Sequence, residues 1–238
     1  MIDDFQQLKR HSVEAKPLDP KLALLRAWQA QRLTRTYADL LANPRYRPAC
    51  LFFLNEIYAP RDFSQRDRDV ETVHDALKHI LPDSLIHPLA TTVELHHLSE
   101  ALDQRLIDVL TGQLGVTESI TTALYVEAYR ICDNYDERVR QIDLVHQIGS
   151  RLDGVVRSPL AGAMLAVSKG PARRAGWGEL TDFLENGYRA FKHMRGARAF
   201  LDTVREREQD ILDRIYASDP DPFGFESQTH PQPPATVT

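Results

Sequence analysis

Residues 49–71 read ACLFFLNEIYAPRDFSQRDRDVE, and this stretch decides the fold class. An apolar block occupies most of residues 50–58 and ends just before Pro60. Because proline has no amide hydrogen and its ring clashes with the preceding helical turn, the block predicts a helix that stops there. The Arg-Asp pairs within residues 61–69 predict the exposed start of the next helix. Residues 49–58 are therefore predicted to form a nearly fully buried helix.

Helical periodicity continues on both sides of this block. Asp19-Pro20 is typical of a helix start, with an acidic N-cap and proline at the first helical position. Apolar residues recur three or four positions apart, and no stretch alternates as a strand would. The predicted helices cover residues 20–40, 49–58, 64–81, 84–110, 117–131, 139–152, 158–168, 180–194 and 200–215. Thr117 is the expected cap of the fifth, and Gly170-Pro171 the expected stop after the seventh.

The fold class predicted from this pattern is all-α, a single multi-helix bundle of about eight or nine helices with no sheet. The expected organisation is a loose N-terminal segment over residues 1–16, a helical domain over residues 17–217 and a disordered tail over residues 218–238. The tail is rich in proline, serine and threonine, which favours a solvated state. Phe223 and Phe225 leave open that the tail docks on the body.

Composition excludes several classes of protein. The chain is 42% hydrophobic and 26% charged, which suits a globular core, and its net charge of −5 argues against a nucleic-acid binder. No apolar run approaches the roughly 18 residues of a membrane-spanning helix. The first residues lack the apolar stretch of a secretory signal. Two cysteines are too few for a disulfide framework, so reduced thiols and a cytoplasmic location are expected.

Positive charge gathers in two segments. Residues 8–47 carry nine basic and three acidic residues, and residues 169–198 carry seven basic and three acidic residues. If the segments lie side by side, they would bind an anionic small molecule or an acidic protein partner. Solvated helix faces paired with nearby carboxylates are the alternative. The candidate ligand-binding residues are Arg26, Arg173, Arg174, Arg189, Lys192 and Arg195.

A metal site is the sharpest chemical hypothesis. The spacing [DE]-x-x-H occurs three times and would place both ligands on one helix face, as in di-metal carboxylate bundles. Glu71/His74 is one pair, and the candidate ligands are otherwise Glu94, His97, Glu127, Asp143 and His146. The metal would be iron or manganese, or haem on His97 or His146. However, one motif carries aspartate and a second lone glutamate is missing, so we expect these pairs to be dispersed.

No catalytic signature accompanies these candidates. The sequence has no glycine-rich phosphate loop, no G-x-S-x-G and no H-E-x-x-H, so catalytic residues are not assigned and no cofactor is expected. The sequence therefore favours a non-enzymatic cytoplasmic helical protein that binds a partner or an anionic small ligand. The alternative is a metal- or haem-dependent oxidoreductase built on the [DE]-x-x-H pairs. The oligomeric state is not set by the sequence.

Three stretches resemble an uncharacterised family of bacterial all-helical proteins. They are FFLNEIYAPRDFSQRD (52–67), VELHHLSEALD (93–103) and LTDFLENGYRAFKHMRGARAFLDTVREREQDIL (180–212). The resemblance covers about residues 20–217. It implies a bacterial, cytoplasmic, helical protein and transfers no activity, cofactor or site residue.

The buried helix over residues 49–58 generates a first prediction. Truncating Phe52 or Phe53 to alanine removes a large apolar side chain from the core, so we expect the free energy of unfolding to fall by about 3–5 kcal/mol for a buried ring. Urea-induced unfolding followed by circular dichroism measures this loss. A loss of only a few tenths of a kcal/mol at both positions would place the rings outside the core.

Overall fold

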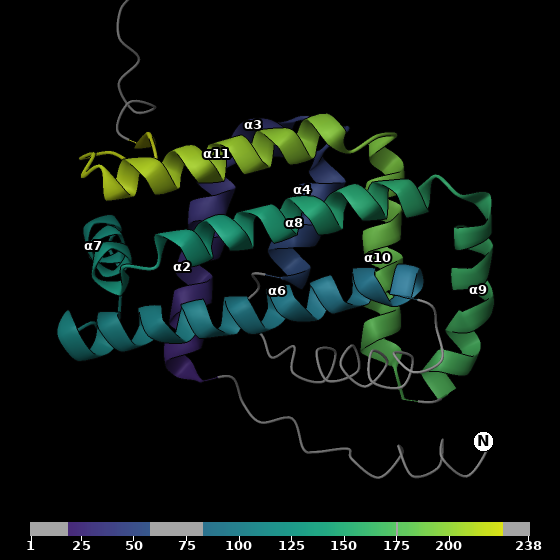
Figure 1. Cartoon of the computed structure of the whole chain (residues 1–238), viewed down its shortest axis with the longest axis horizontal. Coiled ribbons are helices and arrows are strands. Elements are labelled where there is room, and N and C mark those ends of the chain that lie inside the picture. The colour runs from purple at the N-terminus through teal and green to yellow at the C-terminus, as the bar shows by residue number, and fades with distance from the viewer. Residues whose placement is uncertain (1–18, 58–82, 175, 226–238) are drawn as a thin grey trace, which may run out of the picture.

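The computed structural model describes residues 19–57 and 83–225, except residue 175. Within these ranges the chain forms nine α-helices, a π-helical turn and no strand, so the predicted all-α fold class is confirmed (Figure 1). The helices are α2 (Pro20–Thr36), α3 (Ala38–Ala42), α4 (Arg47–Glu56), α6 (Asp83–Asp108), α7 (Thr122–Cys132), α8 (Tyr135–Val156), α9 (Pro159–Arg174), α10 (Gly178–Met194) and α11 (Arg198–Tyr216). The π-helical turn η2 (Val109–Gln113) continues α6.

The helices form two crossing layers. Figure 1 shows α6, α8 and α11 side by side and antiparallel, with α2, α4 and α10 running across them behind. The closest packing joins α8 to α6 on one side and to α11 on the other. Helix α7 closes one end of this layer and α9 the other (Figure 1).

The ends of three helices test the expected boundaries. Asp19 caps α2 as predicted, because its carboxylate accepts a hydrogen bond from the Lys21 backbone N–H at 2.7 Å. The cap of α7 is Thr121, which accepts from the Leu124 N–H at 3.2 Å, so the prediction of Thr117 is wrong. The predicted stop at Pro171 is also wrong, since α9 continues through it.

Tertiary contacts explain why α9 continues past its proline. The Lys169 ammonium pairs with Glu185 at 2.5 Å, and Arg173 pairs with Asp182. Both carboxylates belong to α10, so ion pairs on either side of Pro171 join the last turns of α9 to α10. Proline removes one backbone donor and crowds the preceding turn, and these partly exposed ion pairs offset that cost in part.

Helix α4 is buried on one face only. Phe52 is 9% exposed and packs on Phe183, with ring centroids 5.2 Å apart. Leu51 is 38% exposed and Ile57 is 36% exposed, so the prediction of a nearly fully buried helix is wrong for its outer face. The apolar run is longer than one helix face, and the residues between the inward positions must point outward. The rest of the stretch, with Asp67 and the Glu71/His74 pair, lies outside the described residues.

Two hydrophobic clusters form the core. The first gathers α2, the end of α6, η2, α7 and the end of α11, and includes Leu25, Leu106, Tyr125, Ile215, Phe223 and Phe225. The second gathers α3, α4, α10 and the start of α11, and includes Tyr37, Phe191, Met194, Phe200 and Leu201.

The residues after α11 belong to the first cluster. Phe223 is 6% exposed and Phe225 is 7% exposed, so the expectation of a solvated tail from residue 218 is wrong for residues 219–225. Two phenylalanine rings bury enough apolar area to offset the ordering of a short segment. Residues 226–238 lie outside the described range.

Helix α8 packs closely against α11 at Gly149. A Cβ on Gly149 would stand 2.5 Å from the Cδ2 of Leu201, a side chain that is only 3% exposed. Gly154, five residues later on the same helix, is exposed and would meet nothing within 4 Å. The missing side chain therefore matters at Gly149 and not at Gly154.

This difference gives a matched pair of substitutions. Gly149→Ala should lower the free energy of unfolding by about 1 kcal/mol or more, because the clash with Leu201 exceeds the gain in helix propensity. Gly154→Ala should raise it by roughly 0.5–1 kcal/mol, because only the propensity changes. Thermal and urea unfolding measure both. Equal stabilisation by the two variants would show that α8 and α11 are not in close contact.

Candidate functional site

The two basic segments meet where α10 turns into α11. Arg45, from the first segment, donates from Nε to the Met194 carbonyl at 2.7 Å and from Nη2 to the Gly196 carbonyl at 3.1 Å. His193 Nε2 lies 3.1 Å from the Pro44 carbonyl. The segments are therefore side by side at this turn.

The turn backbone is shaped so that two guanidinium groups can approach it. Arg195 has φ 53° and Gly196 has φ 123°, a conformation that favours glycine. At Gly196 a Cβ would lie 3.7 Å from Arg157 Nη2 and 3.8 Å from Arg45 Nη2. These are ordinary van der Waals distances, so the positive φ rather than a lack of space favours glycine here, and two arginines from different parts of the chain lie beside one turn.

Positive charge exceeds negative charge here. We define the cationic turn as the exposed side chains Arg45, Arg157, Lys192, Arg195 and Arg198. Asp153 accepts from Arg157 and from the Ala197 N–H at 3.0 Å, and it is itself buried. Asp202 lies 3.6 Å from Arg198, which is 92% exposed. Arg45 donates to carbonyl groups, so these contacts leave its charge uncompensated.

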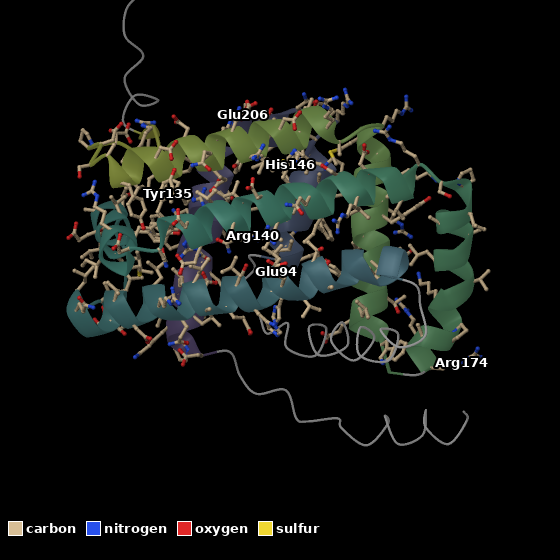
Figure 2. The ribbon with its side chains drawn as sticks, viewed as in Figure 1. Glu94, Tyr135, Arg140, His146, Arg174 and Glu206 are labelled. Atoms are coloured by element: carbon tan, nitrogen blue, oxygen red, sulfur yellow. The ribbon has the colours of Figure 1, made fainter. Side chains whose placement is uncertain are left out.

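The six predicted ligand-binding residues do not form one site. Lys192 and Arg195 belong to the cationic turn. Arg189 pairs with Glu185 on its own helix and Arg173 pairs with Asp182, which matches the alternative of charged faces paired with carboxylates. Arg174 ends α9 at the opposite end of α10, as Figure 2 shows. Arg26 is on α2, where its charge acts on Asp103 of α6.

The metal candidates on α6 and α8 have separate partners. Glu94 accepts from Arg140 at both Nε (3.0 Å) and Nη2 (2.7 Å), and Figure 2 shows this pair between the two helices. Asp143 accepts from Arg205 at 2.9 Å, and His146 Nε2 lies 2.8 Å from Asp202 on α11. The two [DE]-x-x-H pairs therefore do not converge.

The remaining candidates are equally separate. Glu127, on α7, lies 3.8 Å from Arg130, and His97 is an exposed residue of α6. Within residues 19–57 and 83–225, no three side chains of the metal-binding types gather around a common point. The iron or manganese hypothesis therefore finds no assembled ligand set in this part of the chain.

A buried ion pair that the sequence analysis missed joins α2 to α11. Arg32 donates from Nη1 to Glu208 Oε1 at 2.5 Å, and the Tyr37 hydroxyl donates to the same oxygen at 2.6 Å. Burial alone would lower the pKa of Arg32, but Glu208 and nearby tyrosines raise it above its usual value. Arg32 follows Leu25 by seven positions and so shares its helix face. This spacing was the only sign in the sequence that Arg32 is buried.

A second missed polar group lies between α2, α6 and α8. Asp103 accepts from Gln29 Nε2 at 3.1 Å. Burial raises the pKa of Asp103, and Arg138 and Gln29 offset this only in part. Arg138 stacks over the Tyr129 ring at 4.4 Å and donates to the Leu102 carbonyl at 3.4 Å. These contacts place a carboxylate and a guanidinium inside the bundle, and Gln29 Oε1 and Arg138 Nε are buried without a hydrogen-bond partner among the described residues.

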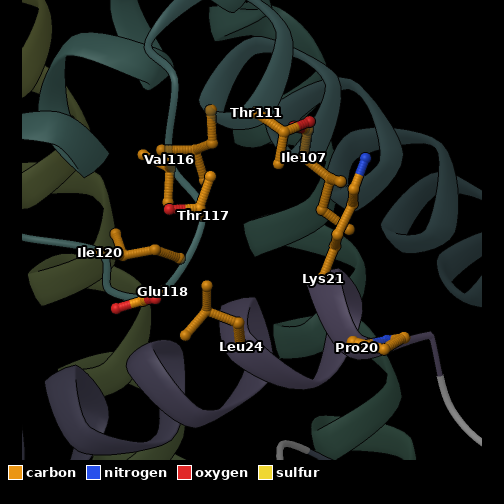
Figure 3. A pocket seen from close by; sticks show the side chains of 10 residues that line it. Pro20, Lys21, Leu24, Ile107, Thr111, Val116, Thr117, Glu118 and Ile120 are labelled. Carbon is orange, nitrogen blue, oxygen red and sulfur yellow. The ribbon is translucent and has the colours of Figure 1, made fainter.

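A pocket of about 480 Å³ lies between the start of α2 and the turn η2 (Figure 3). Its floor is aliphatic, with Leu24, Ile107 and Ile120 pointing into it. Lys21 and Thr111 are at its rim. Such a lining suits an apolar group and carries no recognisable catalytic arrangement.

The fold is thus that of an all-helical protein with a cationic surface at one helix turn. The sequence matches, over residues 7–222, the family described as "Domain of unknown function (DUF8198)". The chain belongs to this family. No curated protein and no solved structure matches it. Among the described residues, no helix has both the length and the apolar character that crossing a membrane requires.

The Arg32–Glu208 pair generates a prediction about stability. Glu208→Gln should lower the free energy of unfolding by about 3–5 kcal/mol, because it leaves the buried Arg32 without a counter-charge. Glu206→Gln is the matched control, since Glu206 is on the same helix but exposed (Figure 2). It should change stability by about 0.5 kcal/mol at most. Guanidinium chloride unfolding compares the two, and equal effects would show that Arg32 does not depend on Glu208.

Proposed function

We propose that this protein is a non-enzymatic binding protein whose cationic turn takes an acidic segment of a partner protein. One observation carries the proposal: side chains at the end of α8, at the end of α10, at the start of α11 and just before α4 place five positive charges around one turn. The carboxylates that contact them are Asp153 and Asp202, and Asp153 is buried. The turn therefore presents a net positive surface to solvent.

The cationic turn differs in charge from the chain as a whole. The whole chain has a net charge of −5, so this turn is a positive region on a negative protein. Such a region attracts carboxylates and orients an approaching partner, and the effect falls as salt rises. Because the cations are exposed and come from several elements, an extended segment with several carboxylates can contact more of them than a single small anion can.

The shape of the turn favours binding by preformed groups. Arg45 is fixed by two backbone carbonyls, so little of its side-chain freedom is lost when a carboxylate arrives. Its guanidinium keeps further N–H donors for a bidentate contact with a carboxylate. Arg198 and Arg195 are exposed beside it and would complete the contact.

A cytoplasmic location and a bacterial origin are part of the proposal. Both cysteines are free, and burial raises the pKa of Cys50 to about 11, so its thiol stays protonated at neutral pH. Free thiols support a reducing compartment. The bacterial origin rests on the resemblance of the three stretches at 52–67, 93–103 and 180–212 to an uncharacterised family of bacterial proteins.

The experiment measures binding of a fluorescein-labelled oligoglutamate peptide by anisotropy at low ionic strength. Arg198→Glu should weaken binding by about fivefold, because it reverses one exposed charge of the turn. Arg174→Glu is the matched control, since it makes the same charge change on an exposed arginine at the far end of α10. It should leave the affinity within about twofold.

The outcomes distinguish binding at the cationic turn from a general effect of the net charge of the chain. Lys192→Glu should reproduce the effect of Arg198→Glu, and added salt should abolish binding by the unmodified chain. Equal loss in the Arg174→Glu and Arg198→Glu variants would mean that only net charge matters. Unchanged binding in both turn variants would exclude the turn as the site.

A further inference from the structure

The chain reverses direction after α11 and returns along the bundle. The Asp219 N–H donates to the Arg214 carbonyl at 3.0 Å, and Ser218 has φ 63°. Residues 219–225, DPDPFGF, then lie against α2 and α11, and we call them the strap. Nothing in the strap is helical until its last residue, so side chains rather than backbone hydrogen bonds with the bundle hold most of it.

Two aromatic rings anchor the strap on α2. Phe225 lies beneath the Arg35 guanidinium, 3.8 Å from ring centroid to Cζ, which is a close cation–π contact. Phe223 packs edge-on against Trp28 at 6.0 Å, with Arg32 5.9 Å above its ring. Both rings are at least nine-tenths buried.

The acidic half of the strap is anchored on α11. Arg214 donates from Nε to the Asp219 carboxylate at 2.8 Å and from Nη2 to the Asp221 carbonyl at 2.5 Å. This hydrogen bond lowers the pKa of Asp219. The groove between α2 and α11 thus binds two chemical features of the strap: an acidic residue, and two phenylalanines separated by one residue.

The strap does not fill this groove. A pocket of about 400 Å³ remains beside Phe223, lined by Arg35, Thr36, Asp39, Arg207 and Ile211 among others. The Thr36 hydroxyl is buried and has no hydrogen-bond partner among the described residues. Arg207 is bonded to both oxygens of Asp39 at 2.7 Å. A segment longer or bulkier than the strap would gain contacts that the strap itself does not make.

We propose that the groove between α2 and α11 recognises acidic, phenylalanine-containing segments of partner proteins, and that the strap occupies it in cis as a competitor. This site is independent of the cationic turn, which lies at the other end of α11. The partner segment shares the strap's chemistry: carboxylates for Arg214 and two aromatic rings for Arg35 and Trp28. It exchanges with the strap because both need the same arginines.

The test uses the full chain and a labelled synthetic peptide of residues 219–225. In the unmodified chain the strap competes, so the peptide should bind weakly. Phe225→Ala weakens the strap and leaves the groove intact, and it should bind the peptide about tenfold more tightly than the unmodified chain. Adding Arg35→Ala to Phe225→Ala should remove this gain, because the peptide's last ring then lacks its cation.

Two controls exclude general loosening of the fold. Phe53→Ala removes a ring from the second hydrophobic cluster, and it should not increase peptide binding. A peptide with alanine at the position of Phe225 should not bind the Phe225→Ala chain better than it binds the unmodified chain. If Phe225→Ala does not fold by circular dichroism, Asp219→Ala replaces it, because it removes the carboxylate contacts with Arg214 and with the Asp221 N–H and keeps both phenylalanine rings.

Three results would overturn the proposal. The first is a folded Phe225→Ala or Asp219→Ala chain that binds the peptide no better than the unmodified chain. The second is a gain that survives Arg35→Ala. The third is a concentration-dependent dimer without peptide binding, measured by size-exclusion chromatography with light scattering, which would mean that the groove accepts only the strap of a second copy.

Discussion

The buried ion pair between Arg32 and Glu208 is the interaction on which the described bundle depends most. It joins α2 near the start of the described chain to α11 near its end, 176 residues later. Two opposite charges inside a core are tolerated only when their geometry is well defined, because each alone would carry a large desolvation penalty. The Tyr37 hydroxyl bonds the same carboxylate, and Phe223 lies under the guanidinium. The pair therefore holds α2 against α11 where the two helix layers cross, and Phe223 packs on this ion pair.

Helix α11 relates the two proposed binding surfaces. It begins at the cationic turn, contacts α8 through Leu201 and Gly149, reaches Glu208 in its second half, and ends where Arg214 bonds the strap. Arginines on α11 and on the neighbouring α2 serve three different purposes: Arg198 is a surface charge, the buried Arg32 pairs with the half-buried Glu208, and Arg35 contacts an aromatic ring. The same residue type thus acts as solvated charge, core group or recognition group according to its neighbours.

The candidate sites could be read from the sequence only in part. The excess of arginine and lysine in two segments was visible, and Arg45 does bring the segments together at Gly196. Which arginines are uncompensated was visible only in part: Arg189 and Glu185 are four residues apart within α10, but Arg173 meets Asp182 only because α9 packs on α10. The [DE]-x-x-H spacing likewise fixes a helix face but not what that face meets, and α8 meets Glu94 with Arg140 rather than with a histidine.

The sequence by itself determined that the chain is helical, and where most helices run, because period and capping are local properties: Asp19 caps α2 through its own next residues. Tertiary structure decided what local signals could not. Helix α9 continues through Pro171, and ion pairs on both sides of the proline join it to α10. Phe223 and Phe225 lie in the segment predicted to be a solvated tail, but they are buried because they pack on Trp28, Arg32 and Arg35. Burial and charge compensation depend on residues far apart in the chain, and only folding brings those residues into contact.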